Sequence, residues 1–248
     1  MHNLSQFLQD TFAKNNKKNA VIAVSGGIDS ALSLSLLVQA LPKKQIWPIL
    51  LPYGRQDMSD AETILDFWQI PAENRKILNI SSIVDAIDKS LLIDDTDKLR
   101  KGNVMARVRM IAVFDYAKSK DALVVGTENK SEYYLGYFTR FGDEASDIEP
   151  LINLYKTQVR QMARELNLPE IFLEKKPSAD LWLDQSDEQE LGFSYELADQ
   201  VLADLIDQKI PSVEIPALFV KEKQDEVVKI LARIQGMVFK REVPYSLS

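Results

Sequence analysis

The chain has 248 residues, of which 46% are hydrophobic and 27% are charged, and its formal net charge is −7. This composition is typical of a soluble globular protein with enough apolar residues for a core, and the length suits one large α/β domain or two small ones. The acidic balance disfavours a nucleic-acid-binding protein, which needs a concentrated basic surface.

Two residue types that often carry out chemistry are almost absent. The sequence has no cysteine and one histidine, His2. Disulfides, thiolate zinc sites and cysteine nucleophiles are therefore excluded, and Ser–His catalysis and histidine metal sites are disfavoured. Residues 1–19 lack the apolar stretch of a signal peptide, and no apolar run approaches the roughly 20 residues of a membrane helix. We expect a cytoplasmic protein with no membrane partner.

Short apolar runs alternate with helical patterns over the first half of the chain. β-branched runs too short for helices predict strands at 20–24, 45–51, 75–80 and 122–126. Apolar spacing predicts helices at 4–16, 29–40, 59–70, 82–91 and 103–120. Ser59, with Glu62 three residues later, is typical of an N-cap, and the charged residues 94–103 indicate a loop. Strands separated by helices of this length predict an α/β fold with a parallel sheet.

The periodicity changes beyond residue 137. Residues 136–150 (GYFTRFGDEASDIEP) predict a long loop over the sheet edge, and residues 175–192 have no period and are expected to form a mobile lid. Further helices are expected at 157–167, 194–207 and 224–237. No repeat, low-complexity tract or linker marks a boundary, so we expect one domain over residues 1–248.

The segment SGGIDS (25–30) follows a predicted strand and opens a predicted helix. This arrangement directs backbone N–H groups and the positive end of a helix dipole at one spot, where an anion can bind. The two glycines let the backbone approach a phosphate closely, and the two serines add hydroxyl donors. The segment has neither the lysine of GxxxxGK[ST] nor the spacing of GxGxxG, so it is neither of those nucleotide-binding loops.

SGGxDS resembles the pyrophosphate loop of the N-type ATP pyrophosphatases, which cleave ATP between the α and β phosphates. Four later segments narrow the resemblance to ammonia-dependent NAD synthetases, and LPYG (51–54) fits as well. These segments are KGNVMARVRM (101–110), GTENKSE (126–132), residues 136–160 and residues 175–195. They occur in the family's order and extend the resemblance over most of the chain.

The resemblance implies a ligase that amidates deamido-NAD with ammonia and converts ATP into AMP and pyrophosphate, the last step of NAD biosynthesis. The nicotinate would be adenylated first, so no protein nucleophile is needed, in agreement with the missing cysteine. The resemblance also implies a Rossmann-like parallel sheet flanked by helices (adenine nucleotide alpha-hydrolase-like), a homodimer, and Mg²⁺ bound with ATP.

The resemblance further implies a set of site residues. ATP contacts are expected from Ala23, Val24, Ser25, Gly26, Gly27, Ile28, Asp29, Ser30, Gln56, Thr127, Lys156 and Ser178. Deamido-NAD contacts are expected from Arg107, Arg140, Asp147, Phe239 and Lys240. Asp29 and Glu132 match the family's Mg²⁺ ligands. Both follow predicted strands, whose carboxyl ends meet at one edge of a parallel sheet, and carboxylates suit this hard ion.

Several positions depart from the family pattern. Leu50 stands where many relatives have an arginine before LPY, and Arg55 lies nearby in the sequence. Arg140 replaces a lysine, which keeps the charge but changes the donor geometry. Phe239 replaces a histidine and cannot make its hydrogen bonds. For Arg109 the sequence indicates no more than a charged helix face.

Two other functions are compatible with the SGGxDS loop. A tRNA lysidine synthase would use a basic RNA-binding surface, which the net charge of −7 disfavours. A non-catalytic nucleotide sensor has no need to retain Asp29, Glu132 and Lys156 together. The sequence therefore favours an ammonia-dependent NAD synthetase with the substrates ATP, deamido-NAD and ammonia, and no nucleic-acid partner.

Overall fold

The structure, a computed structural model, describes all residues except 1, 95, 176, 179–185, 243 and 246–248. Its described residues form a parallel sheet with the strand order β3-β2-β1-β4. The strands are β1 (Asn19–Ala23), β2 (Ile46–Leu50), β3 (Lys76–Ile77) and β4 (Ala122–Val125). The chain adds β2 and β3 on one side of β1 and then crosses to place β4 on the other side. The predicted α/β fold with a parallel sheet is confirmed.

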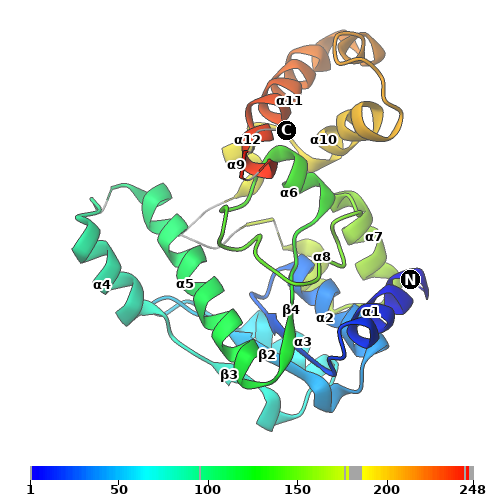
Figure 1. Cartoon of the computed structure of the whole chain (residues 1–248). Coiled ribbons are helices and arrows are strands. Elements are labelled where there is room, and N and C mark those ends of the chain that lie inside the picture. The colour runs from blue at the N-terminus through cyan, green and yellow to red at the C-terminus, as the bar shows by residue number, and fades with distance from the viewer. Residues whose placement is uncertain (1, 95, 176, 179–185, 243, 246–248) are drawn as a thin grey trace.

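The strands are connected by helices, and further helices follow β4 (Figure 1). The α-helices are α1 (His2–Lys14), α2 (Ile28–Ala40), α3 (Ser59–Phe67), α4 (Ser81–Leu91), α5 (Lys98–Ser119), α6 (Lys130–Leu135), α7 (Lys156–Glu165), α8 (Glu170–Glu174), α9 (Asp187–Leu191), α10 (Tyr195–Leu202), α11 (Gln224–Gly236) and α12 (Val238–Arg241). Shorter turns are η1 (Lys43–Gln45), η2 (Ala72–Asn74), the π-helical η3 (Ala203–Asp207), η4 (Ile215–Leu218) and η5 (Lys221–Lys223).

Two hydrophobic cores cover the two faces of the sheet, because successive strand residues point to opposite faces. Ala20 and Ile22 of β1 pack in one core with residues of α1, α2 and α7. Val21 of β1 and Ile49 of β2 pack in the other core with residues of α4 and α5. Figure 1 shows α4 and α5 on one side of the sheet and α1, α2 and α7 on the other. Helices on both faces explain why the strands are apolar runs with little alternation.

A third core lies away from the sheet, in the C-terminal part of the chain. Tyr195 of α10 and Ile230 of α11 are fully buried in it, together with Leu135 of α6. Figure 1 shows α10, α11 and α12 at the top of the view, with α6 between them and the sheet. The helices expected at 194–207 and 224–237 are confirmed as α10, continued by η3, and α11.

Two helix starts differ from the prediction for a local reason. Helix α5 begins at Lys98, inside the segment 94–103 expected to be a loop, because the Asp97 side chain accepts a hydrogen bond from the Arg100 N–H and caps the helix. Ser59 is not an N-cap but the first residue of α3. Its N–H and its hydroxyl both donate to the carboxylate of Asp57, each at 2.9 Å.

The region after β4 contains four short helices that the sequence did not predict, α6, α8, α9 and α12. Helix α6 begins at an asparagine cap, Asn129, and α9 lies within the segment 175–192 expected to be a lid. Residues 176 and 179–185 of that segment lie outside the described residues. Residues 136–150 form the expected loop, apart from a single β-bridge between Ile148 and Val125 of β4.

Candidate active site

A cavity of about 250 Å³ lies at the carboxyl ends of β1 and β4, where the strand order reverses. In open parallel sheets this position is the usual binding site, because the loops that leave neighbouring strands there diverge and leave a crevice. The cavity is lined by the SGGIDS loop, the end of β4, the inner face of α5, the start of α7 and residues around α9. Most of the predicted ATP contacts and both predicted metal ligands line it, namely Ala23, Val24, Ser25, Gly27, Ile28, Asp29, Ser30, Gln56, Thr127, Glu132, Lys156 and Ser178.

Gly26 is the predicted ATP contact that does not line the cavity, and it shapes the loop instead. Its φ is +84°, in the region that favours glycine. A Cβ atom there would lie 2.9 Å from Cβ of Asp60 and 3.1 Å from the Ala61 nitrogen. Only glycine lets the loop turn this closely against the start of α3.

The loop is held by hydrogen bonds among its own residues. The Ser30 hydroxyl donates to the Gly27 carbonyl at 3.0 Å, and the hydroxyls of Ser25 and Ser30 are 3.2 Å apart. Gly27 is the N-cap of α2 and has no side chain with which to satisfy the first N–H groups of the helix. These groups and the positive end of the helix dipole therefore face the cavity, as an anion site requires.

Three charged groups from three elements meet beside this loop. The Lys156 ammonium, at the first position of α7, donates to Asp29 Oδ2 at 2.5 Å and to Glu132 Oε1 at 2.9 Å. The lysine side chain is 2% exposed. Asn129 donates from Nδ2 to the other oxygen of Asp29 at 2.9 Å. Both predicted metal ligands thus point at one cation-binding position.

The electrostatics keep this lysine charged. Burial by itself would lower the pKa of Lys156, but the carboxylates of Asp29 and Glu132 raise it above its ordinary value. Burial raises the pKa of the Glu132 carboxyl, and the ammonium of Lys156 opposes that rise. Lys156 is therefore a buried ammonium held between the carboxyl groups of Asp29 and Glu132.

The same two carboxylates fit a divalent metal ion. They are hard oxygen ligands and already converge on a cation, the Lys156 ammonium. Across the described part of the chain there is no group of three acidic or histidine residues that could hold a metal ion. A site with two carboxylates suits Mg²⁺, which takes one or two protein carboxylates and completes its shell with phosphates and water.

A third carboxylate, which the sequence did not single out, faces the cavity from α9. Asp187 is 3% exposed and lines the cavity, and among the described residues its Oδ1 has no hydrogen-bond partner. Its Oδ2 accepts from the Tyr195 hydroxyl at 3.3 Å. Burial raises the pKa of Asp187, and Lys156 opposes the rise. Asp187 lies within the segment 175–195 that carries the family resemblance, but the sequence indicated no role for this residue.

Arg109 was wrongly assigned to a charged helix face. It lines the cavity, donates from Nε to the Leu51 carbonyl at 3.1 Å and from Nη2 to Gln56 Oε1 at 3.0 Å. A signal was present in the sequence, because the apolar residues Met105 and Val113 each lie four positions from Arg109, on the same face of the helix.

Arg55 does not replace, at the cavity, the arginine that many relatives have before LPY. Leu50 is buried in the core between the sheet and α2, and Arg55 is exposed and does not line the cavity. The guanidinium that reaches the LPYG segment is that of Arg109.

Most of the residues predicted to contact deamido-NAD lie together outside the cavity lining. Arg107 donates to the Arg140 carbonyl at 3.2 Å, and the Arg140 guanidinium lies 5.9 Å from the ring centre of Phe239. The Lys240 ammonium donates to the carbonyls of Gly136 and Phe138, at 2.7 and 2.6 Å. These contacts join α5, the 136–150 loop and α12.

Asp147 is placed apart from that group. Its Oδ2 accepts from the N–H of Val124 in β4 at 2.8 Å, and its own N–H donates to the Val124 carbonyl. The side chain thus fastens the loop to the edge of the sheet and is not brought together with Arg107 or Lys240.

A buried carboxyl group, that of Glu128, and a half-buried one, that of Glu149, lie at the end of β4. Glu149 Oε1 is so close to Gly126 that a Cβ there would be 1.8 Å away, and Glu149 Oε2 accepts from the Glu128 N–H at 3.1 Å. Burial, together with the charge of Glu149, raises the pKa of Glu128 to about 10. Within the described structure, Glu128 Oε1 has no hydrogen-bond partner. The charged form of Glu128 is therefore unfavourable in the folded chain.

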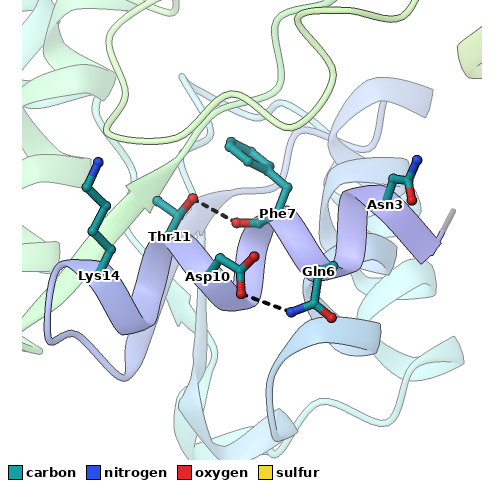
Figure 2. Close-up of a pocket in the computed structure, with 6 residues that line it drawn as sticks. All are labelled: Asn3, Gln6, Phe7, Asp10, Thr11 and Lys14. Atoms are coloured by element: carbon teal, nitrogen blue, oxygen red, sulfur yellow. Dashed lines mark hydrogen bonds between the residues drawn. The ribbon is translucent and has the colours of Figure 1, made fainter.

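A second hollow runs along the outer face of α1 (Figure 2). All six lining residues belong to this one helix, and four of them pair with each other: Gln6 donates to Asp10, and the Thr11 hydroxyl donates to the Phe7 carbonyl. No charged cluster or second element builds a site there. In the described parts of the chain, every helix is too short or too polar to cross a membrane.

Known proteins resemble this chain in sequence over nearly its full length. A family model described as NAD synthase matches residues 1–244. The NH(3)-dependent NAD(+) synthetase of Pyrococcus furiosus is 44% identical over 239 residues, which cover 96% of this chain and 91% of that protein.

Solved structures agree over the whole chain. The NMN synthetase from Francisella tularensis has a TM-score of 0.83 and 33% identity, covering 100% of this chain and 96% of that one. The NH3-dependent NAD synthetase from Campylobacter jejuni subsp. jejuni has a TM-score of 0.81 and 30% identity, covering 100% and 97%. The fold is thus the adenine nucleotide alpha-hydrolase-like fold of these enzymes. Because the family match and these likenesses extend over nearly all of the sequence and include the SGGIDS loop, the chain belongs to the NAD synthase family.

Proposed function

We propose that this chain is an ammonia-dependent NAD synthetase, a ligase that forms the amide of NAD from deamido-NAD and ammonia while ATP becomes AMP and pyrophosphate. The observation that carries the proposal is the meeting of Asp29, Glu132 and Lys156 beside the SGGIDS loop in a chain of this family. A non-catalytic sensor has no use for two carboxylates and a buried lysine at a phosphate-binding loop.

The cavity supports a defined placement of ATP. Ile49, Leu51, Met110 and Val113 give it an apolar side that suits the adenosine. The SGGIDS loop and the start of α2 provide N–H groups and hydroxyls for the phosphates. The α-phosphate would then lie near the group formed by Asp29, Glu132 and Lys156.

Mg²⁺ is proposed as the companion of ATP, with Asp29 and Glu132 as the residues that would hold it. Bound there, it would offset the negative charge on the phosphates as the bond between the α and β phosphates breaks. Lys156 and the amides of the loop add positive charge from the protein itself, which stabilises the same developing charge.

The reaction would proceed in two steps that need no protein nucleophile. An oxygen of the nicotinate carboxylate attacks the α-phosphorus of ATP, the bond to the β-phosphate oxygen breaks, and pyrophosphate leaves. The nitrogen of ammonia then attacks the carbonyl carbon of the adenylate, AMP leaves, and the nitrogen loses a proton to give the amide. The protein contributes by orienting the reactants and by excluding water from the adenylate.

The second group of residues supports a place for deamido-NAD. Arg107, Arg140 and Lys240 bring three positive charges to one side of the molecule, which suits a dinucleotide with two phosphates and a carboxylate. The ring of Phe239 offers a surface for stacking in place of the hydrogen bonds of a histidine. We propose Asp147 as a further contact. Its side chain is exposed, and it is hydrogen-bonded to Val124, which lines the cavity.

We further propose a cytoplasmic homodimer, built from one domain over residues 1–248. The outer faces of α4 and α5 expose large apolar side chains: Leu91 is 55% exposed, Leu99 67% and Ile111 59%. A second copy of the chain would remove this surface from water. The cytoplasmic location agrees with a reaction that consumes ATP.

A second candidate substrate is the mononucleotide counterpart of deamido-NAD. It is favoured by one observation, the TM-score of 0.83 to the Francisella tularensis NMN synthetase. Both candidates carry the same nicotinate carboxylate, so the chemistry is the same and only the binding of the AMP half differs. The curated relative from Pyrococcus furiosus, at 44% identity, favours the dinucleotide.

The test is an assay of the purified chain with ATP, Mg²⁺, ammonium and either the dinucleotide or the mononucleotide. We expect equal amounts of AMP and NAD with deamido-NAD, and a lower kcat/KM with the mononucleotide. Reactions that lack ATP, ammonium or the acid substrate are the controls. A chain that forms neither amide product under these conditions contradicts the proposal.

A further inference from the structure

The Lys156 ammonium occupies the position at which Asp29 and Glu132 converge. Its distances are 2.5 Å to Asp29 Oδ2 and 2.9 Å to Glu132 Oε1. These are the two carboxylates that the proposed function assigns to the metal ion. One position between two carboxylates cannot hold an ammonium group and a divalent ion together.

The other oxygen of each carboxylate already accepts a hydrogen bond from Asn129. Asp29 Oδ1 accepts from Asn129 Nδ2 at 2.9 Å, and Glu132 Oε2 accepts from the Asn129 N–H at 3.4 Å. Asn129 itself is fully buried. The oxygens that bind Lys156 are thus the ones through which a metal ion would bind, and the carboxylates are oriented whether or not the lysine is present.

The backbone of Lys156 is held by a hydrogen bond, whereas its side chain can rotate within the cavity toward the phosphate-binding loop. Its N–H donates to the Ser131 hydroxyl at 2.9 Å, and that hydroxyl donates to Asp199. The side chain lines the same cavity as Gly27 and Ser30 of the phosphate-binding loop. Its rotatable bonds let the ammonium move without moving α7.

Charge balance then links the metal ion to the nucleotide. Two carboxylates and one ammonium leave one net negative charge, and a divalent ion added beside the lysine would give three positive charges against two negative ones at close range. The phosphates of ATP supply the missing negative charge and new acceptors for the ammonium. We infer that Lys156 is the resident counter-ion of the Asp29–Glu132 pair, and that it keeps divalent metal out until a nucleotide draws its ammonium away.

This inference rests on the proposed function and adds a second role for Lys156, that of a positioning residue that makes the metal ion and the nucleotide bind together. It predicts weak metal binding to the nucleotide-free chain. It also predicts that removal of the ammonium group alone creates a metal site.

The test uses Mn²⁺, followed by the electron paramagnetic resonance of the free ion, with no nucleotide present. Lys156→Met is expected to bind one Mn²⁺ at least about tenfold more tightly than the wild type, because both carboxylate oxygens become free. Lys156→Arg keeps the positive charge and is expected to bind as weakly as the wild type. Lys101→Met is the matched control, since that lysine is ion-paired with Asp88 and lies outside the cavity lining. Equal or weaker Mn²⁺ binding by Lys156→Met overturns the inference.

A second arm needs no lysine variant and covers the case in which Lys156→Met does not fold. Mn²⁺ is titrated into the wild type and into Asp29→Asn, again without nucleotide, and the two are expected to bind it equally weakly. Binding to the wild type that is about tenfold tighter than to Asp29→Asn would show that the lysine does not exclude the ion. None of these titrations contains deamido-NAD or ammonia, so their outcome is independent of whether the chain makes NAD.

Discussion

The side-chain nitrogen of Asn129 lies 2.9 Å from Asp29 Oδ1, although the two residues are 100 positions apart in the sequence. The oxygen of the same amide accepts the Glu132 N–H at 3.0 Å and thereby caps α6. Asn129 therefore orients both carboxylates of the candidate site: its side-chain amide donates to Asp29, and its backbone N–H donates to Glu132 Oε2 at 3.4 Å. Because α2 follows β1 and α6 follows β4, this contact also joins the two strand ends at which the sheet order reverses.

The replacement Asn129→Asp tests this dual role. Aspartate keeps an acceptor for the α6 cap but loses the donor to Asp29 and places a further negative charge beside it. We expect AMP formation to fall roughly a hundredfold, the cost of displacing a reacting group by about 1 Å, while the chain still folds. The measurement is initial-rate AMP formation together with a circular dichroism melt. Activity close to that of the wild type would show that Asp29 keeps its orientation without Asn129.

The isosteric replacements Asp29→Asn and Glu132→Gln test the proposed metal ligands. Each removes one negative charge and keeps the shape, so we expect AMP formation to fall roughly a hundredfold or more, with part of the loss recovered at high Mg²⁺. Glu62→Gln, an exposed change on α3, is the control and should leave the rate unchanged. A variant that keeps near wild-type turnover at ordinary Mg²⁺ would remove its residue from the set of ligands.

Glu128 gives a prediction for the pH dependence of stability. Its pKa is raised from 4.5 to about 10, chiefly by burial and next by the charge of Glu149, whose own pKa burial raises to about 8. Between pH 4.5 and about 10 the folded chain therefore holds a proton that the unfolded chain has released. The stabilisation that comes from this bound proton is fully present at acidic pH and is lost as the pH rises. The free energy of unfolding then falls by at most about 1.4 kcal/mol per pH unit for one group.

Glu128→Gln removes the proton that titrates and keeps the shape of the side chain. We expect the free energy of unfolding of this variant to fall less than that of the wild type between about pH 6 and about pH 9. Chemical denaturation at several pH values gives the two curves. The exposed Glu73→Gln is the control, expected to follow the wild type. If the free energies of unfolding of Glu128→Gln and the wild type fall in parallel as the pH rises, Glu128 is not the group that causes this loss of stability.

The nitrogen donor is expected to be free ammonia and not glutamine. A glutaminase of the cysteine type needs a cysteine nucleophile, and this chain has none. Ammonium has no lone pair for attack on the adenylate, so at a fixed, subsaturating total ammonium concentration the rate should rise with pH through the mildly alkaline range. The assay compares ammonium with ammonia-free glutamine for the purified chain. Sustained NAD synthesis from glutamine alone would contradict the prediction that free ammonia is the nitrogen donor.

The sequence by itself determined the fold class and the phosphate-binding loop. Short β-branched runs, such as residues 20–24, are strands because a run of that length cannot form a helix but can be buried on both faces of a sheet. The SGGIDS loop was recognisable because its glycines are needed locally, as the φ of +84° at Gly26 shows. These features depend on residues that are neighbours in the chain, and for this reason a sequence pattern records them.

Only the tertiary structure decided which side chains meet in the cavity. Arg109 reaches the LPYG segment because α5 crosses the sheet with that face inward, and Asp187 faces Lys156 because α9 packs over the cavity. The pairing of Lys156 with both carboxylates depends on three separate elements, since Asp29 lies 127 positions and Glu132 lies 24 positions from Lys156. No local pattern specifies such contacts, because they follow from the packing of whole helices on the sheet and not from the spacing of residues along one element.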